Sequence, residues 1–300
     1  MPDPCWRYVG GKSWLVDNHG DLLPTADEIR RRGGIYREPF VGGGAVVLGR
    51  YAGRCPVAIS DANGPVVRAY RAIRDDVEAL IEALAKVAPT YDRAVFERYR
   101  EGINAGTLRG LDEAVAVFVI LAWGYNGLWR LAKNGRLNTP FGKPSKPGAI
   151  PKLFDAANLR AVAVALVDAV IRELDFEAAA AEAQPGDYVF FDPVYEPASD
   201  TADFTAYAGG WRVCDPAKLG QRSLLDAGHA SDLERLAWVC EQLGLRGVEW
   251  GLTNADVPVV RRVFERWPMT RLEARRSVSS KADTRGPVGE LFITNRRMNS

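Results

Sequence analysis

The sequence predicts an α/β fold built on an open, mostly parallel sheet. Short apolar runs of strand length alternate with longer helical patterns, as expected for such a sheet. The clearest run, residues 188–191, leads directly into Asp192-Pro193-Val194-Tyr195. A chain of 300 residues allows one large α/β domain or one domain with an insertion.

The first part of the chain predicts a strand, a glycine loop and a helix, which is the layout of nucleotide-type cofactor sites. The expected elements, in order, are a helix opening at 9–13 and continuing past Leu15, a strand at 34–40, a glycine loop at 41–45, a helix start at 46–48, a strand at 57–61, and a helix beginning at Asn63. The glycines would let the backbone approach a ligand closely.

The remainder predicts helices first and then the rest of the sheet. Residues 66–164 look mostly helical, and the apolar run 114–123 is expected to be a buried helix because it is too short to span a bilayer. Residues 165–176 predict a helix and a short strand ending at Asp175-Phe176. Strands near 247–253 and 291–294 complete the predicted sheet.

The composition argues against a metal-binding, a secreted or a membrane protein. The net charge of +1 says nothing about the kind of partner. The four cysteines form no CxxC pair and the chain has only two histidines, so no metal site is expected. The N-terminus lacks a basic-then-apolar signal pattern. We therefore expect a cytoplasmic protein without a membrane segment.

Charge is uneven along the chain. Residues 130–154 contain six basic residues and no acid, and they are rich in Gly, Pro and Asn. This pattern predicts a loop or hairpin. A second basic stretch runs over 261–285. Basic loops with aromatics such as Trp129 and Phe141 suit phosphate and base contacts, although a solvated loop would explain one such run alone.

The tetrapeptide after the strand 188–191 suits an exocyclic amine on a flat heterocycle. The Asp192 carboxylate and the Pro193 carbonyl accept hydrogen bonds from an NH2 group, and the Tyr195 ring offers a stacking surface. Ligands of open α/β sheets bind at the carboxyl ends of the strands. This edge is therefore the candidate catalytic site.

The glycine loop favours S-adenosyl-L-methionine over phosphate-bearing cofactors. It has neither GxGxxG spacing nor the GxxxxGK[ST] pattern, and the Gly-Lys-Ser at 11–13 is better explained as a helix start. S-adenosylmethionine has no phosphate and needs close backbone approach, an acid for its ribose and an apolar slot for its adenine. Asp61 and Phe176 would supply the last two.

The order of these motifs resembles the Dam-type (alpha-group, D12 class) DNA adenine-N6 methyltransferases. The matching segments are 8–12, 38–44, 61–63, 125–130, 138–142, 175–176 and 192–195, followed by 204–207, 275–280, 284–285 and 290–291. The resemblance covers nearly the whole chain. It implies a Rossmann-like, mostly parallel sheet, with residues 1–65 and 165–300 forming the S-adenosylmethionine-binding catalytic domain and residues 66–164 an inserted, mainly helical target-recognition domain.

The resemblance also implies roles, position by position. The cofactor-binding residues would be Tyr8, Lys12, Pro39, Phe40, Gly42, Gly44, Asp61, Asp175, Phe176 and Asp192. The catalytic residues would be Asp192, Pro193 and Tyr195. The expected DNA-binding residues are Asn126, Arg130, Lys133, Arg136, Asn138, Pro140, Lys143, Lys146, Arg276 and Ser279.

Two departures separate this chain from the family pattern. Val194 stands where the family has a second proline, and the segment between Tyr207 and Asp232 is longer than in shorter members. The expected function is site-specific methylation of adenine N6 in double-stranded DNA, by a monomer in the cytoplasm beside the nucleoid. An RNA or nucleotide amino-methyltransferase and a catalytically weakened DNA-binding relative are the alternatives.

Overall fold

The computed structural model describes residues 1–132, 134–144, 148–195, 231–272 and 289–296. In this part of the chain a seven-stranded sheet has the order β3-β2-β1-β4-β5-β7-β6. The strands are β1 (Tyr36–Glu38), β2 (Val57–Asp61), β3 (Val170–Glu173), β4 (Tyr188–Phe191), β5 (Glu249–Ala255), β6 (Met269–Leu272) and β7 (Glu290–Thr294). The first five strands of that order run parallel, whereas β7 pairs antiparallel with both β5 and β6. The predicted α/β class and mostly parallel sheet are confirmed.

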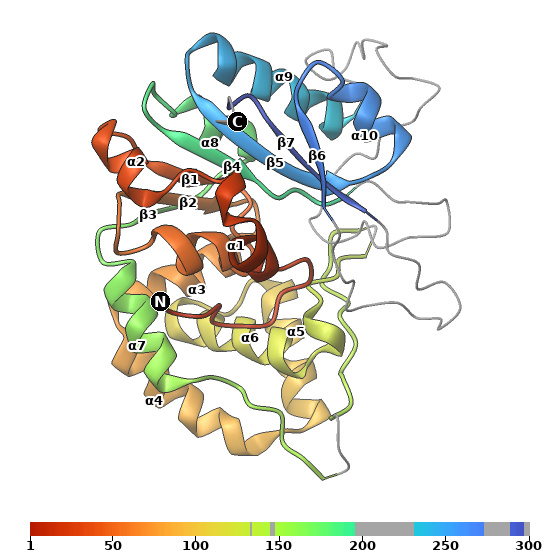
Figure 1. Ribbon diagram of the computed structural model, residues 1–300. Coiled ribbons are helices and arrows are strands. Elements are labelled where there is room, and N and C mark those ends of the chain that lie inside the picture. Colours follow the sequence, from red (N-terminus) through yellow and green to blue (C-terminus); the bar gives the residue numbers. More distant parts are fainter. Residues whose placement is uncertain (133, 145–147, 196–230, 273–288, 297–300) are drawn as a thin grey trace.

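Helices cover both faces of the sheet, as Figure 1 shows. One side carries α1 (Ser13–His19), α3 (Gly64–Asp75), α4 (Val77–Val87), α5 (Arg93–Ala105), α6 (Gly110–Trp123) and α7 (Ala156–Ala165). The other side carries α8 (Phe176–Ala181), α9 (Asp232–Leu245) and α10 (Pro258–Val263). The short helix α2 (Ala26–Arg31) begins with a capping box between Thr25 and Glu28. None of the described helices is long and apolar enough to cross a membrane.

The side-chain period of the central strands explains the two layers. In β4 all four side chains are buried: Tyr188 and Phe190 belong to the core beneath α3 and α6, whereas Val189 and Phe191 belong to the core beneath α9. Successive residues of a strand point to opposite faces. A strand buried on both faces therefore reads as an uninterrupted apolar run, as this one does.

Most of the predicted elements match the structure. The strand 57–61 is β2, the run 188–191 is β4, and the apolar run 114–123 lies in the buried helix α6. The first strand is shorter than expected, because the chain leaves the sheet after Glu38. Instead of an α-helix, residues Val47–Tyr51 form a π-helical turn. Five of the described α-helices and strands were not predicted, namely α2, α8, α9, α10 and β6.

The helical segment between β2 and β3 is packed onto the sheet. Buried side chains of α3, α4, α6 and α7 share one continuous apolar core with β1 and β2. Their ends are fixed locally; for example, Asp92 caps α5 by accepting from the amides of Ala94 and Val95. The boundary of a recognition domain at residues 66–164 stays a prediction.

Candidate active site

The sheet has its topological switch point between β1 and β4. These two strands are parallel neighbours, yet the chain continues from β1 to β2 on one side and from β4 to β5 on the other. Ligands of open α/β sheets bind in the crevice at this point, beyond the carboxyl ends of the strands. The segments that leave the sheet here are the glycine loop after Glu38 and the tetrapeptide after Phe191.

The glycine loop is shaped by its packing on two tyrosines. Gly42 and Gly44 have positive φ values of 44° and 67°, which side chains rarely tolerate. A Cβ on Gly44 would lie 2.6 Å from the Tyr70 hydroxyl, and one on Gly42 would lie 3.0 Å from the Tyr8 ring. The structure therefore brings together Tyr8, Gly42 and Gly44 as predicted, but protein side chains fill the space in front of these two Cβ positions.

Asp61 ties the glycine loop to the end of β2. Its Oδ2 accepts from the Gly42 amide at 3.0 Å and its Oδ1 from the Asn63 amide at 2.9 Å. Burial raises the pKa of Asp61, and these backbone hydrogen bonds oppose that rise. Asp61 thus holds the loop in place, in addition to the ribose role that the sequence predicts.

The predicted adenine residues lie at the start of α8. Asp175 caps this helix by accepting from the Glu177 amide at 3.0 Å, and its carboxylate pairs with Arg235 of α9. Phe176 is 4% exposed. Its ring is 5.3 Å from the Phe40 ring, and the Arg235 guanidinium lies 4.1 Å from the Phe176 ring centre. Phe40 and Phe176 are therefore neighbours, as a shared apolar slot requires.

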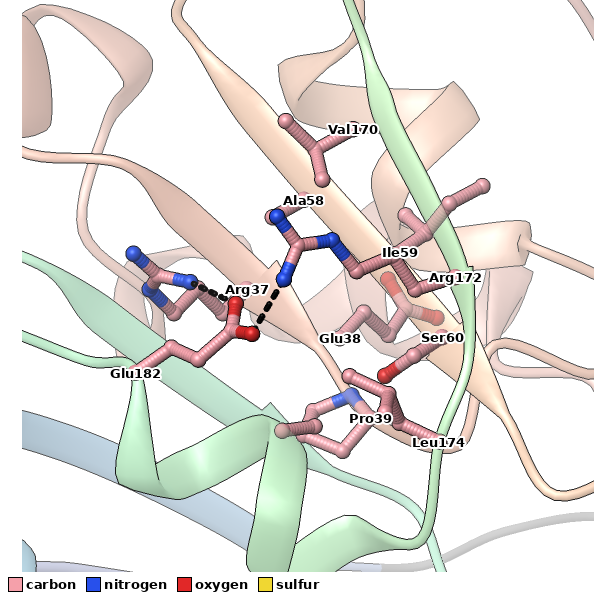
Figure 2. A pocket seen from close by; sticks show the side chains of 11 residues that line it. Arg37, Glu38, Pro39, Ala58, Ile59, Ser60, Val170, Arg172, Leu174 and Glu182 are labelled. Atoms are coloured by element: carbon pink, nitrogen blue, oxygen red, sulfur yellow. Dashed lines mark hydrogen bonds and ion pairs between the residues drawn. The ribbon is translucent and has the colours of Figure 1, made fainter.

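A shallow pocket opens on the α8 face of β1, β2 and β3 (Figure 2). Its polar lining is dominated by Glu182, which pairs with Arg172 and lies 3.7 Å from Arg37. Of the predicted cofactor residues that the structure describes, only Pro39 lines this pocket. Glu38 and Ser60 also line the pocket, so it borders the edge where Asp61 and Asp192 lie.

Asp192 is held from two sides. Its Oδ1 accepts a hydrogen bond from Thr253 Oγ1 at 2.7 Å and lies 3.0 Å from Lys12 Nζ. Thr253 belongs to β5, and Lys12 directly precedes α1. Among the described residues, no partner contacts Oδ2 of Asp192. Both of these contacts are made to the same oxygen of the carboxylate.

Tyr195 is fixed by a contact from the antiparallel end of the sheet. Its hydroxyl donates to Glu290 Oε2 at 2.7 Å. Lys12 Nζ lies 4.7 Å from the Tyr195 ring centre and 3.9 Å from the same carboxylate oxygen of Glu290. Asp192, Tyr195, Lys12, Thr253 and Glu290 therefore form one connected cluster, which we call the edge cluster.

Burial governs the ionisation of the acids here. Burial raises the pKa of Asp192, while Lys12 and Thr253 act in the opposite direction. Burial also raises the pKa of Glu38 to about 8, although the Tyr36 hydroxyl donates to it at 2.7 Å. Asp192 and Asp61 add to the rise at Glu38, which shows that three carboxylates gather at this edge.

The basic segment begins as an antiparallel hairpin, as the sequence predicts. Isolated bridges join Gly124 to Phe141 and Leu131 to Leu137. Arg130 is exposed, and its guanidinium donates to Asn138 through Nε at 2.8 Å and to the Asn138 carbonyl through Nη2 at 3.0 Å. These two predicted DNA-binding residues therefore lie side by side across the hairpin.

The base of the hairpin touches the N-terminal segment of the site. Gly127 has a φ of 66°, and a Cβ there would lie 2.6 Å from the Arg7 carbonyl. Arg7 precedes Tyr8, which packs on the glycine loop. Asn126 has a φ of 56°, an uncommon value for a residue with a side chain, and the Pro140 carbonyl accepts from the Tyr125 amide at 2.9 Å. The predicted Asn126 and Pro140 thus lie close to the candidate active site.

The other side chains of the hairpin differ in how accessible they are to a DNA partner. Lys143 is exposed, whereas Arg136 is paired with Glu101 of α5 at 2.6 Å. Trp129 is buried, and the half-buried Phe141 packs against Tyr91. Trp129 is therefore part of the core and is not placed to contact bases, whereas a base contact of Phe141 stays a prediction.

Four predicted DNA-binding residues, Lys133, Lys146, Arg276 and Ser279, lie outside the described residues. The described residues contain no group of three or more His, Cys, Asp or Glu side chains placed to hold a metal ion. Cys5, Cys55 and Cys240 are free thiols.

Sequence reasoning missed two members of the edge cluster. Thr253 lies within a predicted strand, but an isolated threonine carries no local signal of a role. Glu290 lies in a segment that resembles the family, yet it received no role. A pairing of β7 with β5, which places Glu290 opposite Ala255 and Thr253 opposite Phe292, brings these distant residues to the edge.

The fold and this edge define an α/β enzyme of the Rossmann-like type with an acid–proline–tyrosine site at its switch point. Residues 8–225 match the family model described as D12 class N6 adenine-specific DNA methyltransferase. The chain belongs to this family of DNA adenine-N6 methyltransferases, and the predicted function is confirmed at that level.

Relatives of known family align with this chain over nearly their full length. The chain is 30% identical to Type II methyltransferase M.MjaIII of Methanocaldococcus jannaschii, with 97% of this chain and 98% of the relative covered. It is 27% identical to Type II methyltransferase M1.LlaDCHI of Lactococcus lactis subsp. cremoris, over 97% and 95% of the two chains. It is 29% identical to the DNA adenine methylase of Escherichia coli K12, over 95% and 92%.

Proposed function

We propose that the protein transfers a methyl group from S-adenosyl-L-methionine to N6 of an adenine flipped out of duplex DNA. The observation that carries this proposal is the edge cluster, in which an oriented carboxylate and an aromatic ring lie together at the switch point, with the Pro193 carbonyl between them in the sequence. The same edge adjoins the glycine loop on one side and the base of the basic hairpin on the other. The cofactor, the target base and the duplex would thus bind at adjacent sites.

The chemistry of the cofactor side fits S-adenosylmethionine. Asp61 and Asp192 bring two acids to this edge, beside a Glu38 whose pKa of about 8 keeps it mostly neutral near pH 7. Such a set of acids suits a cationic ligand with a ribose diol better than a pyrophosphate. Asp61 offers acceptor positions beyond the two backbone amides it already binds, and Phe40 and Phe176 provide apolar surface. When bound, S-adenosylmethionine supplies an electrophilic methyl group on a sulfonium.

On the base side, Asp192 and Pro193 would bind and orient the target amine. Oδ2 of Asp192 and the Pro193 carbonyl would accept its two N–H groups, which favours a tetrahedral and more nucleophilic nitrogen. Positioning of that nitrogen in line with the methyl group supplies much of the remaining rate advantage. Stacking on Tyr195 offsets about 1–3 kcal/mol of the few kcal/mol that flipping costs.

On the duplex side, Arg130, Asn138 and Lys143 of the hairpin would contact DNA. Phosphate contacts set the position of the protein on the duplex, whereas contacts to base edges select the sequence. Arg130 keeps Nη1 available to a guanine edge while Asn138 orients the group. The expected monomer is tested by light scattering with and without duplex DNA.

Methyl incorporation from labelled S-adenosylmethionine tests the proposal. We expect transfer to duplex DNA in excess of single-stranded DNA and RNA, and N6-methyladenine as the product. Asp192→Ala should abolish transfer and leave cofactor affinity nearly unchanged, because its proposed ligand is the amine. Asp256→Ala is the matched control: this carboxylate follows β5 and is paired with Arg261 at 2.5 Å. Preferred transfer to RNA, or an active Asp192→Ala variant, would contradict the proposal.

A further inference from the structure

We propose that Glu290 is a positioning residue of the reaction, which holds the Tyr195 ring at the target base and shares the Lys12 ammonium with the amine-binding acid. This inference rests on the proposed function. It assigns a role to a residue that touches neither the target amine nor the cofactor. Its basis is the geometry of the edge cluster.

Glu290 is well placed to fix another side chain. It is the first residue of β7, paired with Ala255 of β5 on one side and Leu272 of β6 on the other. Its side chain is 10% exposed. Because its backbone is paired on both sides and its side chain is largely buried, the Glu290 carboxylate has little freedom to move. A side chain that hydrogen-bonds to this carboxylate is therefore held in place.

That partner is the stacking residue. Tyr195 lies four residues beyond the end of β4, where no strand pairing restrains it. The 2.7 Å hydrogen bond from its hydroxyl to Glu290 Oε2 restrains the far end of the ring. A hydrogen bond to a charged acceptor is stronger than one to a neutral acceptor. The Tyr195 ring is therefore oriented before a base arrives. Less conformational entropy of this side chain is then lost when the base stacks on it.

The second contact concerns Lys12. Its side chain is 4% exposed, and its ammonium lies 2.6 Å from the Gly10 carbonyl, 3.0 Å from Asp192 and 3.9 Å from Glu290. Two carboxylates thus share one buried cation. Without Glu290, the Lys12 charge would be balanced by Asp192 alone, and this tighter ion pair would withdraw negative charge from the Asp192 oxygen that binds the target amine.

Steady-state kinetics on duplex DNA with Glu290→Ala and Glu290→Gln test the role. For Glu290→Ala we expect kcat to fall by about tenfold or more, the equivalent of one charge-assisted hydrogen bond, with cofactor affinity retained. Glu290→Gln keeps an acceptor for the phenol and should be closer to wild type. A substrate with a mismatched target adenine should partly restore the activity of Glu290→Ala, because such a base leaves the helix at lower cost. A residue that only stabilises the fold would give no such recovery.

A double-mutant cycle with Tyr195→Phe tests the route of the effect. If Glu290 acts mainly through the phenol, adding Glu290→Ala to Tyr195→Phe should cost little further. If the losses of activity in the two single variants multiply in the double variant, Glu290 does not act through the Tyr195 hydroxyl. Glu249→Ala is the matched control, because Glu249 is an ion-paired acid of the same sheet at the opposite end of β5, 2.7 Å from Arg32.

The two proposals fail in different ways. An active Asp192→Ala variant would overturn the proposed site itself. An inactive Asp192→Ala variant together with a fully active Glu290→Ala variant would overturn the role of Glu290 alone. Loss of activity in Glu290→Ala that follows a lowered melting temperature, with no recovery on mismatched DNA, would also overturn it.

Discussion

The ammonium nitrogen of Lys12 lies 3.0 Å from Oδ1 of Asp192, and the two side chains are 4% and 20% exposed. Lys12 precedes α1, whereas Asp192 follows β4. A buried ammonium requires a paired charge, so this contact ties the N-terminal segment to the catalytic edge. Lys12, expected from the resemblance to serve the cofactor, contacts the acid that we propose binds the target amine.

Loss of the Asp61 carboxylate should affect both the cofactor and the loop. We expect Asp61→Ala to weaken S-adenosylmethionine binding by about 1.5–3 kcal/mol, as for the loss of a hydrogen bond to a charged group. The amides of Gly42 and Asn63 would also lose their acceptor, so the melting temperature should fall although the protein still folds. Calorimetric titration and thermal unfolding measure the two effects, and an unchanged affinity would remove Asp61 from the cofactor site.

Restoring proline at position 194 should preserve activity. Among the described residues Val194 donates no backbone hydrogen bond, and its φ is not positive. A proline there removes no backbone hydrogen bond to a described residue, and it restricts the unfolded chain. We expect Val194→Pro to match or modestly exceed wild-type turnover, with equal or higher stability. A large loss of turnover with normal folding would show that the loop needs a backbone shape that proline does not adopt.

The buried Glu38 should make stability depend on pH. Its pKa is raised from 4.5 to about 8 in the folded protein, so between these values the folded state binds more protons than the unfolded state. The free energy of unfolding therefore decreases as pH rises from about 4.5 through about 8 and then levels off. Glu38→Gln keeps an acceptor for Tyr36 and should lack this contribution.

Urea unfolding at a series of pH values checks the Glu38 prediction. The stability of Glu38→Gln relative to wild type should increase with pH across that window. Glu249→Gln, the same change on a partly exposed acid of the sheet, is the control and should follow the wild-type profile. Parallel profiles for wild type and Glu38→Gln would mean that Glu38 titrates in its ordinary range.

Arg130 should select sequence, in contrast to Arg136 on the same hairpin. Arg130 is exposed and oriented by Asn138, and loss of a bidentate guanine contact costs about 1–3 kcal/mol at one base position. Arg136 is paired with Glu101, so Arg136→Ala should leave the preference unaltered. Methylation of a randomised DNA library by each variant provides the comparison. An unchanged preference in Arg130→Ala would exclude it as a reading residue.

The sequence by itself determined the class of fold, the position of the switch-point motifs and the family. β4 is an uninterrupted apolar run and β2 ends in an acid, and both signals are local. The tetrapeptide 192–195 and the glycine loop are also contiguous, so their residue types alone indicate amine and cofactor chemistry. The hairpin after α6 was predictable for the same reason, because glycine, proline and asparagine mark turns locally.

Only the tertiary structure decided which side chains meet. β6 was missed because only Leu272 of its four residues is buried and its arginine resembles the surrounding basic stretch. The placement of Thr253 beside Asp192 and of Glu290 beside Tyr195 depends on the register of β5 and β7, and a shift of one residue would turn each side chain to the other face. Such a register is set by packing between distant segments. The edge cluster therefore has no signature in the local sequence.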